Sequence, residues 1–432
     1  MELFDTGISW IGNVPSDWKI LPLKSVSKVI LGKMLQDKQK SQEETLERYI
    51  CAKDVHLDGI NWYEPKEMYF SPMEKNLLLV KKGDLLIVEG GAGAGGAFVA
   101  ENPTKYNYYV QNSINIVRVN KKFAVPQYVY YWIFKLVTNK YVEVACNVAT
   151  IPHFTKEKVS SVQIPLPSID IQRRIVNYLD TKVAEIDNQI SLLSKKRDAY
   201  MRLKKSIIHR AVSQGLNPDV EMKDSGVDWI GMIPKHWEIK RFKEVFRAYT
   251  TGITPESKNS AYFEVAGGYT WVTIADMSGV KYVRESNLNL SNIAVTLFNP
   301  ALSVKGSLLF SFKLSVGKIS IAAKDLYTNE AIVTIPPKDS YCISYIYYML
   351  PNILIHNSVE NIYGAKMLNQ KIIVNMLMAI PSVNEQHTIA DYLDEKTAKI
   401  DAVVCVIEKQ IEKYKQLKRA LINEVVTGQR AV

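Results

Sequence analysis

Hydrophobic and polar positions follow the same order of patterns in both halves of the chain. Apolar runs of strand length occupy residues 85–88 and 307–310, and a turn glycine introduces each run. Apolar and polar residues alternate at 114–119, and 331–335 is the counterpart in the second half. These runs predict buried and half-buried strands within a mixed domain in each half.

A tyrosine-rich amphipathic segment follows the strands in both halves, at 128–133 and 345–350. Proline or serine residues precede both segments and fit the start of a helix. The aromatic side chains recur at helical spacing, which favours a packed core over a platform for stacking bases. The segments therefore predict one core helix per half.

Each half closes with a stretch whose apolar residues recur every three or four positions, at 168–214 and 382–428. About 45 residues at ~1.5 Å each span more than 60 Å, which exceeds the width of one such domain. We therefore expect two long helices that pack on each other; two separate helices, each on its own domain, are the alternative. The predicted seam residues are Ile175, Leu179, Ile186, Ile190, Leu193, Ile389, Leu393, Ile400, Val404, Ile407 and Ile411, and the seam is interrupted at Arg197, Lys204, Thr397 and Lys418.

A short motif opens both halves and indicates an internal duplication. Residues 7–18 and 226–237 share Gly, Trp, Gly, Pro and Trp in one register, and the chain has only seven tryptophans in 432 residues. A duplicated chain predicts one task performed at two places. We expect these tryptophans to pack where each domain begins rather than to stack on bases.

The net charge of +10 and the pI near 9.1 change this picture by making a polyanion a plausible partner. No run of 18 apolar residues and no charged-then-apolar leader is present, so a cytoplasmic location is expected. The four cysteines lie far apart and form no CxxC pair, which argues against a zinc site or a disulfide framework.

Residues 91–96 match GxGxxG, but 97–100 read as a strand, whereas a dinucleotide site needs a helix there. A mobile loop between two strands is the better interpretation. Residues 218–223 superficially resemble a PD…ExK nuclease signature, but both carboxylates fall in a predicted linker. The chain also has no GxxxxGK[ST], HExxH or GxSxG motif. No catalytic or metal-binding residue is therefore predicted.

Polar loops follow the first strand of each half, at 32–40 and 252–259, and they share little beyond their glycine. Different loops on matching scaffolds suit two different specificities, and Lys, Gln and Asn can contact phosphates and base edges. An ordinary solvated loop is the alternative for each residue. The predicted DNA-binding residues are Lys33, Gln36, Lys38, Lys53, Gly93, Thr254, Lys258, Asn259, Lys313 and Lys318.

Together these segments resemble the specificity subunits of type I restriction-modification systems, over essentially the whole chain. Residues 225–238 resemble the family's linker-to-domain signature, 251–255 with 271–276 resemble one domain variant, and 32–36 resemble another. Residues 164–167 with Gln172, Ile175, Tyr178, Leu179 and Asp180 resemble the entry to the first conserved helix, which Pro381, Glu385, Gln386, Ile389, Tyr392, Leu393 and Asp394 repeat. The family's Glu-Gln pair occurs only once, because Ile171 stands where the second half has Glu385.

The resemblance implies an α+β fold with two mixed α/β target recognition domains in a pseudo-two-fold arrangement, separated by two long antiparallel coiled-coil helices. The expected limits are 1–165 and 225–378 for the domains, 168–214 and 382–428 for the helices, and 215–224 for a linker. Each domain is expected to bind half of a split DNA target while the helices set the spacer.

The resemblance also implies two methyltransferase subunits docked on the helices, together with restriction subunits that translocate DNA. S-adenosylmethionine, ATP and Mg²⁺ are expected on those partners and none on this chain, which is expected to be non-catalytic. Alternatives are a methyltransferase-only or type II-like system, a hidden nuclease or methyltransferase, and a coiled-coil scaffold that binds only proteins.

Overall fold

The computed structural model describes residues 2–63, 65–91, 93–101, 106–146, 152–313, 315–360 and 366–432. The chain forms two compact units, which are described separately. Unit 1 comprises Met1–Ser194 and Glu408–Val432, and unit 2 comprises Lys195–Ile407. Both units combine helices with mainly antiparallel sheets, so the predicted α+β class is confirmed.

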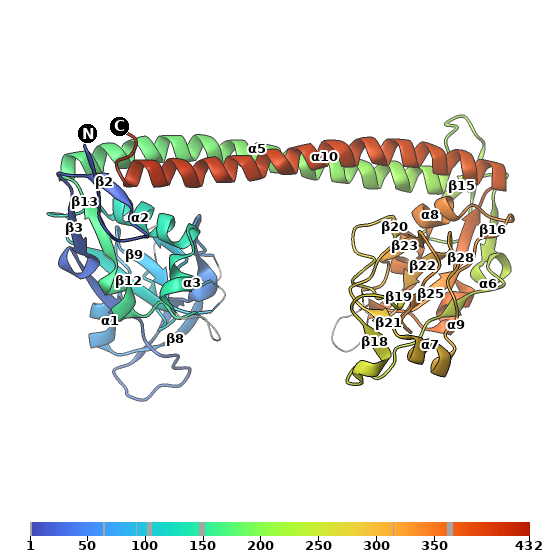
Figure 1. The fold of residues 1–432 in the computed structure, drawn as a ribbon, viewed down its shortest axis with the longest axis horizontal. Helices are drawn as coiled ribbons and strands as arrows, with labels where there is room; N and C mark the ends of the chain where they lie inside the picture. The colour runs from blue at the N-terminus through green and yellow to red at the C-terminus, as the bar shows by residue number, and fades with distance from the viewer. Residues whose placement is uncertain are drawn as a thin grey trace. The chain divides into compact units, whose positions relative to one another are not determined.

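The central sheet of unit 1 is antiparallel (Figure 1), and its two inner strands are buried on both faces. Leu85 and Ile87 of one inner strand belong to the core beneath helix α2, whereas Leu86 and Val88 face a second, three-stranded sheet. Alternation of side chains along the strand explains how one apolar run serves two cores. In sheet order the strands are β10 (Ala97–Val99), β9 (Leu85–Val88), β12 (Ile114–Val119) and β4 (Ser27–Leu31), then β11 (Tyr109–Val110), β5 (Thr45–Ile50) and β8 (Lys66–Phe70).

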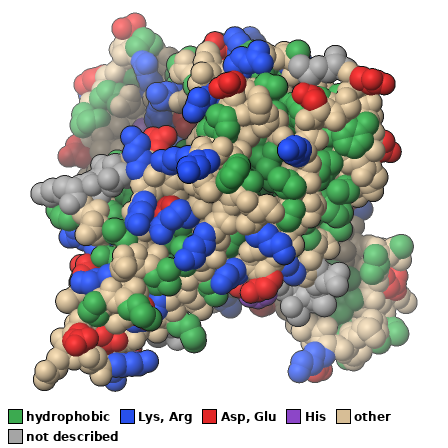
Figure 2. Space-filling model, turned by 90° about the vertical axis from the view of Figure 1, so that its left-hand side faces the viewer, with side chains coloured by type: hydrophobic (Ala, Val, Ile, Leu, Met, Phe, Trp, Pro, Cys, Tyr) green, Lys and Arg blue, Asp and Glu red, His purple; other side chains and the backbone are tan. Residues whose placement is uncertain are grey.

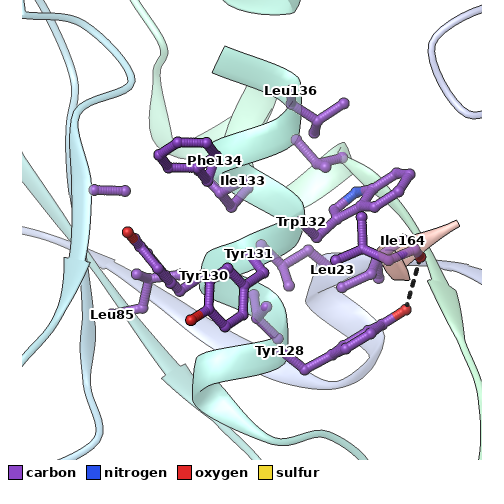
Figure 3. Packing of buried hydrophobic residues seen from close by; sticks show 14 of the residues in the cluster. Leu23, Leu85, Tyr128, Tyr130, Tyr131, Trp132, Ile133, Phe134, Leu136 and Ile164 are labelled. Atoms are coloured by element: carbon purple, nitrogen blue, oxygen red, sulfur yellow. Dashed lines mark hydrogen bonds between the residues drawn. The ribbon is translucent and has the colours of Figure 1, made fainter. Parts of the chain in front are cut away.

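Helix α2 (Pro126–Thr138) carries the tyrosine-rich segment, and its aromatic side chains are core residues as predicted (Figure 3). Tyr128 and Trp132 are fully buried, and the Tyr128 hydroxyl donates a hydrogen bond to the Pro165 carbonyl at 2.6 Å. The other elements of unit 1 are β1 (Leu3–Asp5), β2 (Asn13–Pro15), β3 (Lys19–Pro22), β6 (Val55–His56), β7 (Gly59–Ile60), α1 (Pro72–Leu78), α3 (Tyr141–Ala145), α4 (Lys156–Ser161) and β13 (Gln163–Leu166).

Unit 2 repeats this plan around a five-stranded sheet. Leu308 and Phe310 pack in the core with helix α8 (Ile343–Asn357), and Leu309 packs on the opposite face. In sheet order the strands are β17 (Thr250–Thr251), β25 (Ile332–Ile335), β22 (Leu308–Ser311), β23 (Ile319–Ala322) and β20 (Tyr282–Val283), and a second sheet holds β18 (Phe263–Glu264), β21 (Asn289–Leu290), β19 (Tyr269–Val272) and β24 (Tyr327–Thr328). The remaining elements include β14 (Met222–Asp224), β15 (Met232–Pro234), β16 (Glu238–Arg241), α6 (Phe242–Val245), α7 (Asn292–Phe298), β26 (Val359–Glu360), β27 (Lys366–Met367), α9 (Gln370–Asn375) and β28 (Leu377–Ile380).

The two predicted long helices are α5 (Ile169–Gln214) and α10 (Val383–Val426). In unit 1 the beginning of α5 packs against the end of α10, because Ile175 and Leu179 share one core cluster with Leu421 and Val425 (Figure 1). The helices of unit 1 are therefore antiparallel. Each unit thus takes its helical part from two distant stretches of sequence, whereas the predicted domain limits are continuous in sequence.

The doubled motif packs against the end of a long helix in both units. Gly428 follows α10 with φ 71°, and a Cβ atom there would lie 2.5 Å from Pro15 Cδ and 3.1 Å from Trp18 Cζ2. Gly215 follows α5 with φ 75°, and a Cβ atom there would lie 3.5 Å from Trp237 Cζ2. Both tryptophans are buried, so the predicted packing role is confirmed for the second tryptophan of each motif.

Across the described residues, no helix is both long and apolar enough to cross a membrane. No group of three or more His, Cys, Asp or Glu side chains that could hold a metal ion is found in the same part of the chain.

Candidate nucleic-acid interface

In both units, the two loops predicted to contact DNA leave the central sheet at one edge, whereas Lys53 follows β5 of the second sheet of unit 1. Strands β4 and β9 of unit 1 are each antiparallel to β12, and Leu31 pairs with Asn115 while Val88 pairs with Ile114. Both strands therefore end at the same edge. The polar loop after β4 and the glycine-rich loop after β9 emerge together there, and we call this the loop edge of unit 1.

Unit 2 has the same arrangement. Strands β17 and β22 are both antiparallel to β25, with Thr251 opposite Val333 and Ser311 opposite Ile332. The loop that carries Thr254 and the loop between β22 and β23 thus share an edge, the loop edge of unit 2. The two pairs of predicted loops are brought together by strand direction, although about 50 or more residues separate the members of each pair.

The one glycine that the polar loops share is required by close backbone contact at both edges. An ideal Cβ atom on Gly32 would lie 2.2 Å from the Gln111 carbonyl oxygen, and one on Gly252 would lie 1.7 Å from the Thr328 carbonyl oxygen. Both separations are far below van der Waals contact, so any side chain would displace the neighbouring backbone. The shared glycine is therefore structural, and the residues after it are the variable part.

Two predicted residues of unit 1, Lys33 and Gln36, have structural partners. The Lys33 ammonium lies 2.6 Å from a Glu74 carboxylate oxygen, and only 10% of its side chain is exposed. Gln36 is buried, and its amide donates to the Lys38 carbonyl and to Glu44 at 3.0 and 2.8 Å. The structure thus assigns both side chains a role in shaping the loop, while their contact with DNA stays a prediction.

The other three predicted residues of unit 1 are open to solvent. Lys38 is exposed, and half of the Lys53 side chain is exposed beside Asp54. Gly93 lies in an exposed turn between β9 and β10, which pair antiparallel and confirm the predicted loop between two strands. These residues remain available for an anionic ligand.

Unit 2 presents Thr254 and Lys258 as exposed residues on the loop after β17. The Asn259 side chain instead accepts a hydrogen bond from the Ala261 amide at 3.1 Å and caps a short 3-10 helix, η3 (Ser260–Tyr262). On the neighbouring loop Lys313 is exposed, whereas the Lys318 ammonium donates to Ser278 Oγ at 2.7 Å. Lysines and a threonine therefore dominate the exposed set at this edge.

In each unit one buried glutamine connects the start of a long helix to the start of α2 or α8, and sequence reasoning did not assign it this role. Gln172 accepts from the Val125 amide at 2.9 Å, and Gln386 accepts from the Cys342 amide at 2.8 Å. Each also donates to a proline carbonyl of the segment before its helix, Pro167 or Pro381. The signal that could have identified them is a glutamine at the same place in both helices.

A hydrogen bond between a tyrosine and an aspartate also connects α2 to α5 in unit 1 and α8 to α10 in unit 2. The hydroxyl of Tyr131 donates to Asp180 at 2.6 Å, and the hydroxyl of Tyr348 donates to Asp394 at 2.5 Å. Burial, and next the hydrogen bond to the carboxylate, raises the pKa of both tyrosines well above the ordinary range. Both hydroxyls therefore stay protonated and serve as donors that orient α2 and α8 on the long helices.

The predicted seam residues take part in the packing of the long helices to different degrees. Ile190 and Leu193 are only partly buried, and the other nine are buried. Two of the interruptions are explained by salt bridges between helices: Lys418 lies 2.7 Å from Asp187 in unit 1, and Lys204 lies 2.7 Å from Asp401 in unit 2. Charged residues at such positions select the register and orientation of paired helices.

The surface charge of unit 1 fits a polyanionic ligand. Lys and Arg side chains gather on the face of unit 1 that Figure 2 shows. A net charge of +10 supplies long-range attraction to phosphates, and this attraction weakens as salt is added. The interface thus combines general attraction with loops that differ between the units.

Comparison with known proteins agrees with the duplicated plan. The family model described as the type I restriction modification DNA specificity domain matches residues 15–194 and again residues 234–413. The chain is 20% identical to the type I restriction enzyme MjaVIII specificity subunit of Methanocaldococcus jannaschii, with 96% of this chain and 93% of the relative covered. It is 18% identical to the EcoBI specificity subunit of Escherichia coli, with 99% and 89% covered.

One solved structure, from work on complex assembly and conformational transition of the type I R-M system, has a similar fold. It covers 96% of this chain and 98% of its own, with a TM-score of 0.70 at 18% identity. The two family matches together cover far more than half of the 432 residues. The chain therefore belongs to the type I restriction modification DNA specificity domain family and carries two copies of that domain.

Proposed function

We propose that this member of the specificity family is the DNA-reading subunit of a type I restriction-modification complex. In this proposal each unit binds one half of a bipartite target through its loop edge. The observation that carries the proposal is the repeated framework with different loops: equivalent strands deliver residues 32–40 and 252–259 to the same place, yet beyond the glycine only one residue coincides, Lys38 with Lys258. Equal scaffolds with unequal loops suit two unequal half-sites.

The long helices are proposed to hold the two readers at a fixed separation. They are also proposed to dock two methyltransferase subunits, and restriction subunits complete the assembly. The specificity subunit names of the relatives support this division of labour. We further propose that this chain is non-catalytic, so S-adenosylmethionine binds to the methyltransferase subunits, while ATP and Mg²⁺ serve the partner subunits that translocate and cleave DNA.

Base flipping at the methylated adenine then takes place in a partner pocket. This chain contributes affinity for DNA and sets the position of the complex on the duplex. Exposed lysines neutralise phosphates, which fixes the register on the duplex, and loop side chains contact base edges, which selects the sequence. A methyltransferase-only or type II-like system would use the same reading subunit, and a cleavage assay on the purified complex distinguishes these cases.

Methylome sequencing of cells that express the chain with its methyltransferase partners tests the proposal. The expected result is one methylated-adenine motif with two specified half-sites and a single, constant spacer length. A continuous motif, or half-sites at variable spacing, contradicts the two-reader arrangement. If the purified complex shows no preference for any duplex sequence at moderate salt, the protein-only scaffold is the better account.

A further inference from the structure

A cleft of about 590 Å³ in unit 2 has no role in the reading of half-sites described so far. Its walls come from α5, α8 and α10, from the segment that leads into β20 and from the start of β23. Lys205 and His209 project from α5, Tyr347 and His356 from α8, and Lys281 comes from the segment before β20. All of these residues belong to unit 2.

The carboxylates at the cleft are already neutralised. Asp401 is paired with Lys204, and Lys281 forms a close ion pair with Asp394, which also accepts the Tyr348 hydroxyl. Among the described residues, no carboxylate forms a salt bridge with Lys205, and both Lys205 and His209 are exposed. His356 stacks on Trp229 with ring centroids 5.3 Å apart, which holds its ring at the cleft. The cleft therefore offers unpaired basic groups to an anion.

The same place in unit 1 is filled by aromatic packing. Phe134 occupies the position in α2 that Pro351 occupies in α8. Tyr130, the counterpart of Tyr347, is buried: it packs edge-on against Phe98 at 5.3 Å, and its hydroxyl donates to the Leu57 carbonyl at 2.7 Å. The framework is thus shared, but the residues at this place are buried in unit 1, whereas their counterparts in unit 2 line the cleft.

The cleft is continuous with the loop edge of unit 2. Lys318, one of the predicted DNA-binding residues, donates to Ser278, and the residues that follow these two, Ile319 and Gly279, line the cleft. The α5 segment that leads to the cleft is strongly basic, because residues 195–210 contain seven Lys or Arg residues and only one acidic residue, Asp198. A ligand that crosses the loop edge can therefore extend into a cleft whose α5 wall carries Lys205 and His209.

We propose that this cleft binds one segment of the DNA sugar–phosphate backbone beside the half-site that unit 2 reads. Lys205 and His209 contact a phosphate, and the face of Tyr347 packs against the adjoining sugar. The inference rests on the proposed function, and it adds a contact that contributes affinity and position but no base discrimination. The arrangement also makes backbone binding unequal in the two units, since Tyr130 and Phe134 of unit 1 are buried in the corresponding aromatic cluster.

The test compares Lys205→Gln with Lys196→Gln in the full-length chain assembled with its methyltransferase partners. Lys196 has the same charge and is also exposed, but nine residues are about 2.5 turns, so it lies on the opposite face of α5. Binding to the target duplex is measured across a salt series. For Lys205→Gln we expect weaker binding and a slope of log K against log salt that is smaller by about 1, with an unchanged preference among half-site variants.

A duplex series with single uncharged methylphosphonate linkages then locates the contact. At one position in the duplex, the uncharged linkage should weaken binding by the wild-type complex and by Lys196→Gln. The same linkage should not weaken binding by Lys205→Gln any further. An unchanged salt slope for Lys205→Gln, with target preference intact, overturns the cleft proposal alone. Weaker assembly with the methyltransferase subunits and normal DNA binding means that a protein occupies the cleft. If the wild-type complex itself shows no preference for the target duplex over half-site variants, the proposed function is contradicted.

Discussion

The two units have the same hydrogen bonds between their tyrosine-rich helix, α2 or α8, and the long helices but different surfaces at their loop edges. Gln172 and Gln386 make matching hydrogen bonds, and so do the Tyr131–Asp180 and Tyr348–Asp394 pairs. At the loop edges unit 1 has a glycine-rich loop where unit 2 has the Lys313 loop. In the proposed function, positioning would then depend on the shared contacts and recognition on the differing loops.

Removal of the buried glutamines should have the largest effect on stability and should affect both units equally. Gln172→Leu or Gln386→Leu leaves buried backbone groups without partners, at ~1–3 kcal/mol for each group, so we expect a loss of roughly 3 kcal/mol in the free energy of unfolding. Urea denaturation measures the change. The exposed Gln189→Leu and Gln410→Leu are matched controls and should change stability by less than about 0.5 kcal/mol. A large effect in only one unit would show that these hydrogen bonds are not equivalent.

Substitutions near the ends of the long helices should have smaller effects on stability, and these effects should be opposite in sign in the two units. Trp237 Nε1 donates to Glu385 at 3.0 Å, whereas Trp18 Nε1 is buried without a partner among the described residues, and Ile171 stands at the position of Glu385. Glu385→Ile should therefore destabilise unit 2 by ~1–3 kcal/mol. Ile171→Gln should stabilise unit 1 by up to ~1 kcal/mol, because the amide can accept from Trp18.

Melting curves of the two variants test this pairing. The neutral Gln is chosen because Asp17 occupies in unit 1 the place of His236, whose ring lies 2.9 Å from a Glu385 oxygen. A carboxylate at position 171 would be repelled by Asp17. If Ile171→Gln lowers the melting temperature as much as Glu385→Ile does, the missing hydrogen bond of Trp18 Nε1 does not reduce the stability of unit 1.

Unit 1 also contains a buried ammonium that unit 2 lacks, and it predicts a pH dependence. Burial lowers the pKa of Lys135 to about 8, and Asn352 stands at the equivalent position of α8. Between this value and the ordinary pKa near 10.5, the unfolded chain binds more protons than the folded chain. The free energy of unfolding should then rise with pH from 8 to 10, by ~1 kcal/mol per pH unit.

Urea midpoints at pH 7 to 10 check this dependence. Lys135→Met should flatten the rise, and Asn352→Met is the control that should leave it unchanged. A wild-type profile that is already flat above pH 8 would mean that Lys135 remains charged in the folded chain, held by its contacts with the Trp10 carbonyl and with the Trp132 ring at 4.5 Å.

Most of the architecture was predictable from sequence because it depends on short-range periodicity. The long helices, the tyrosine-rich core helices and the strand at 85–88 all follow from apolar spacing. The hydrogen bonds that connect α2 and α8 to the long helices were not predictable, since Gln172 reaches an amide 47 residues away in sequence, and neither were the partners of Lys33 and Gln36. Such contacts depend on tertiary placement, which residue type and spacing do not specify.

The candidate interface was predicted at the level of loops rather than side chains. Strand direction places the predicted loops on one edge in each unit, but within them Lys33, Gln36 and Asn259 are engaged in internal contacts. Polar residue type alone cannot distinguish a side chain that shapes a loop from one that faces a ligand. The exposed loop residues, including Lys38 of unit 1 and Thr254 and Lys258 of unit 2, are therefore the first targets for mutagenesis.

Exchange of one recognition unit tests the central claim most directly. Residues 1–165 are replaced by the corresponding segment of a relative with a different target, and the methylated motif is read by methylome sequencing. We predict that one half-site changes to that of the donor while the other half-site and the spacer length remain the same. A change in both half-sites, or in neither, would contradict the claim that each unit reads its own half of the target.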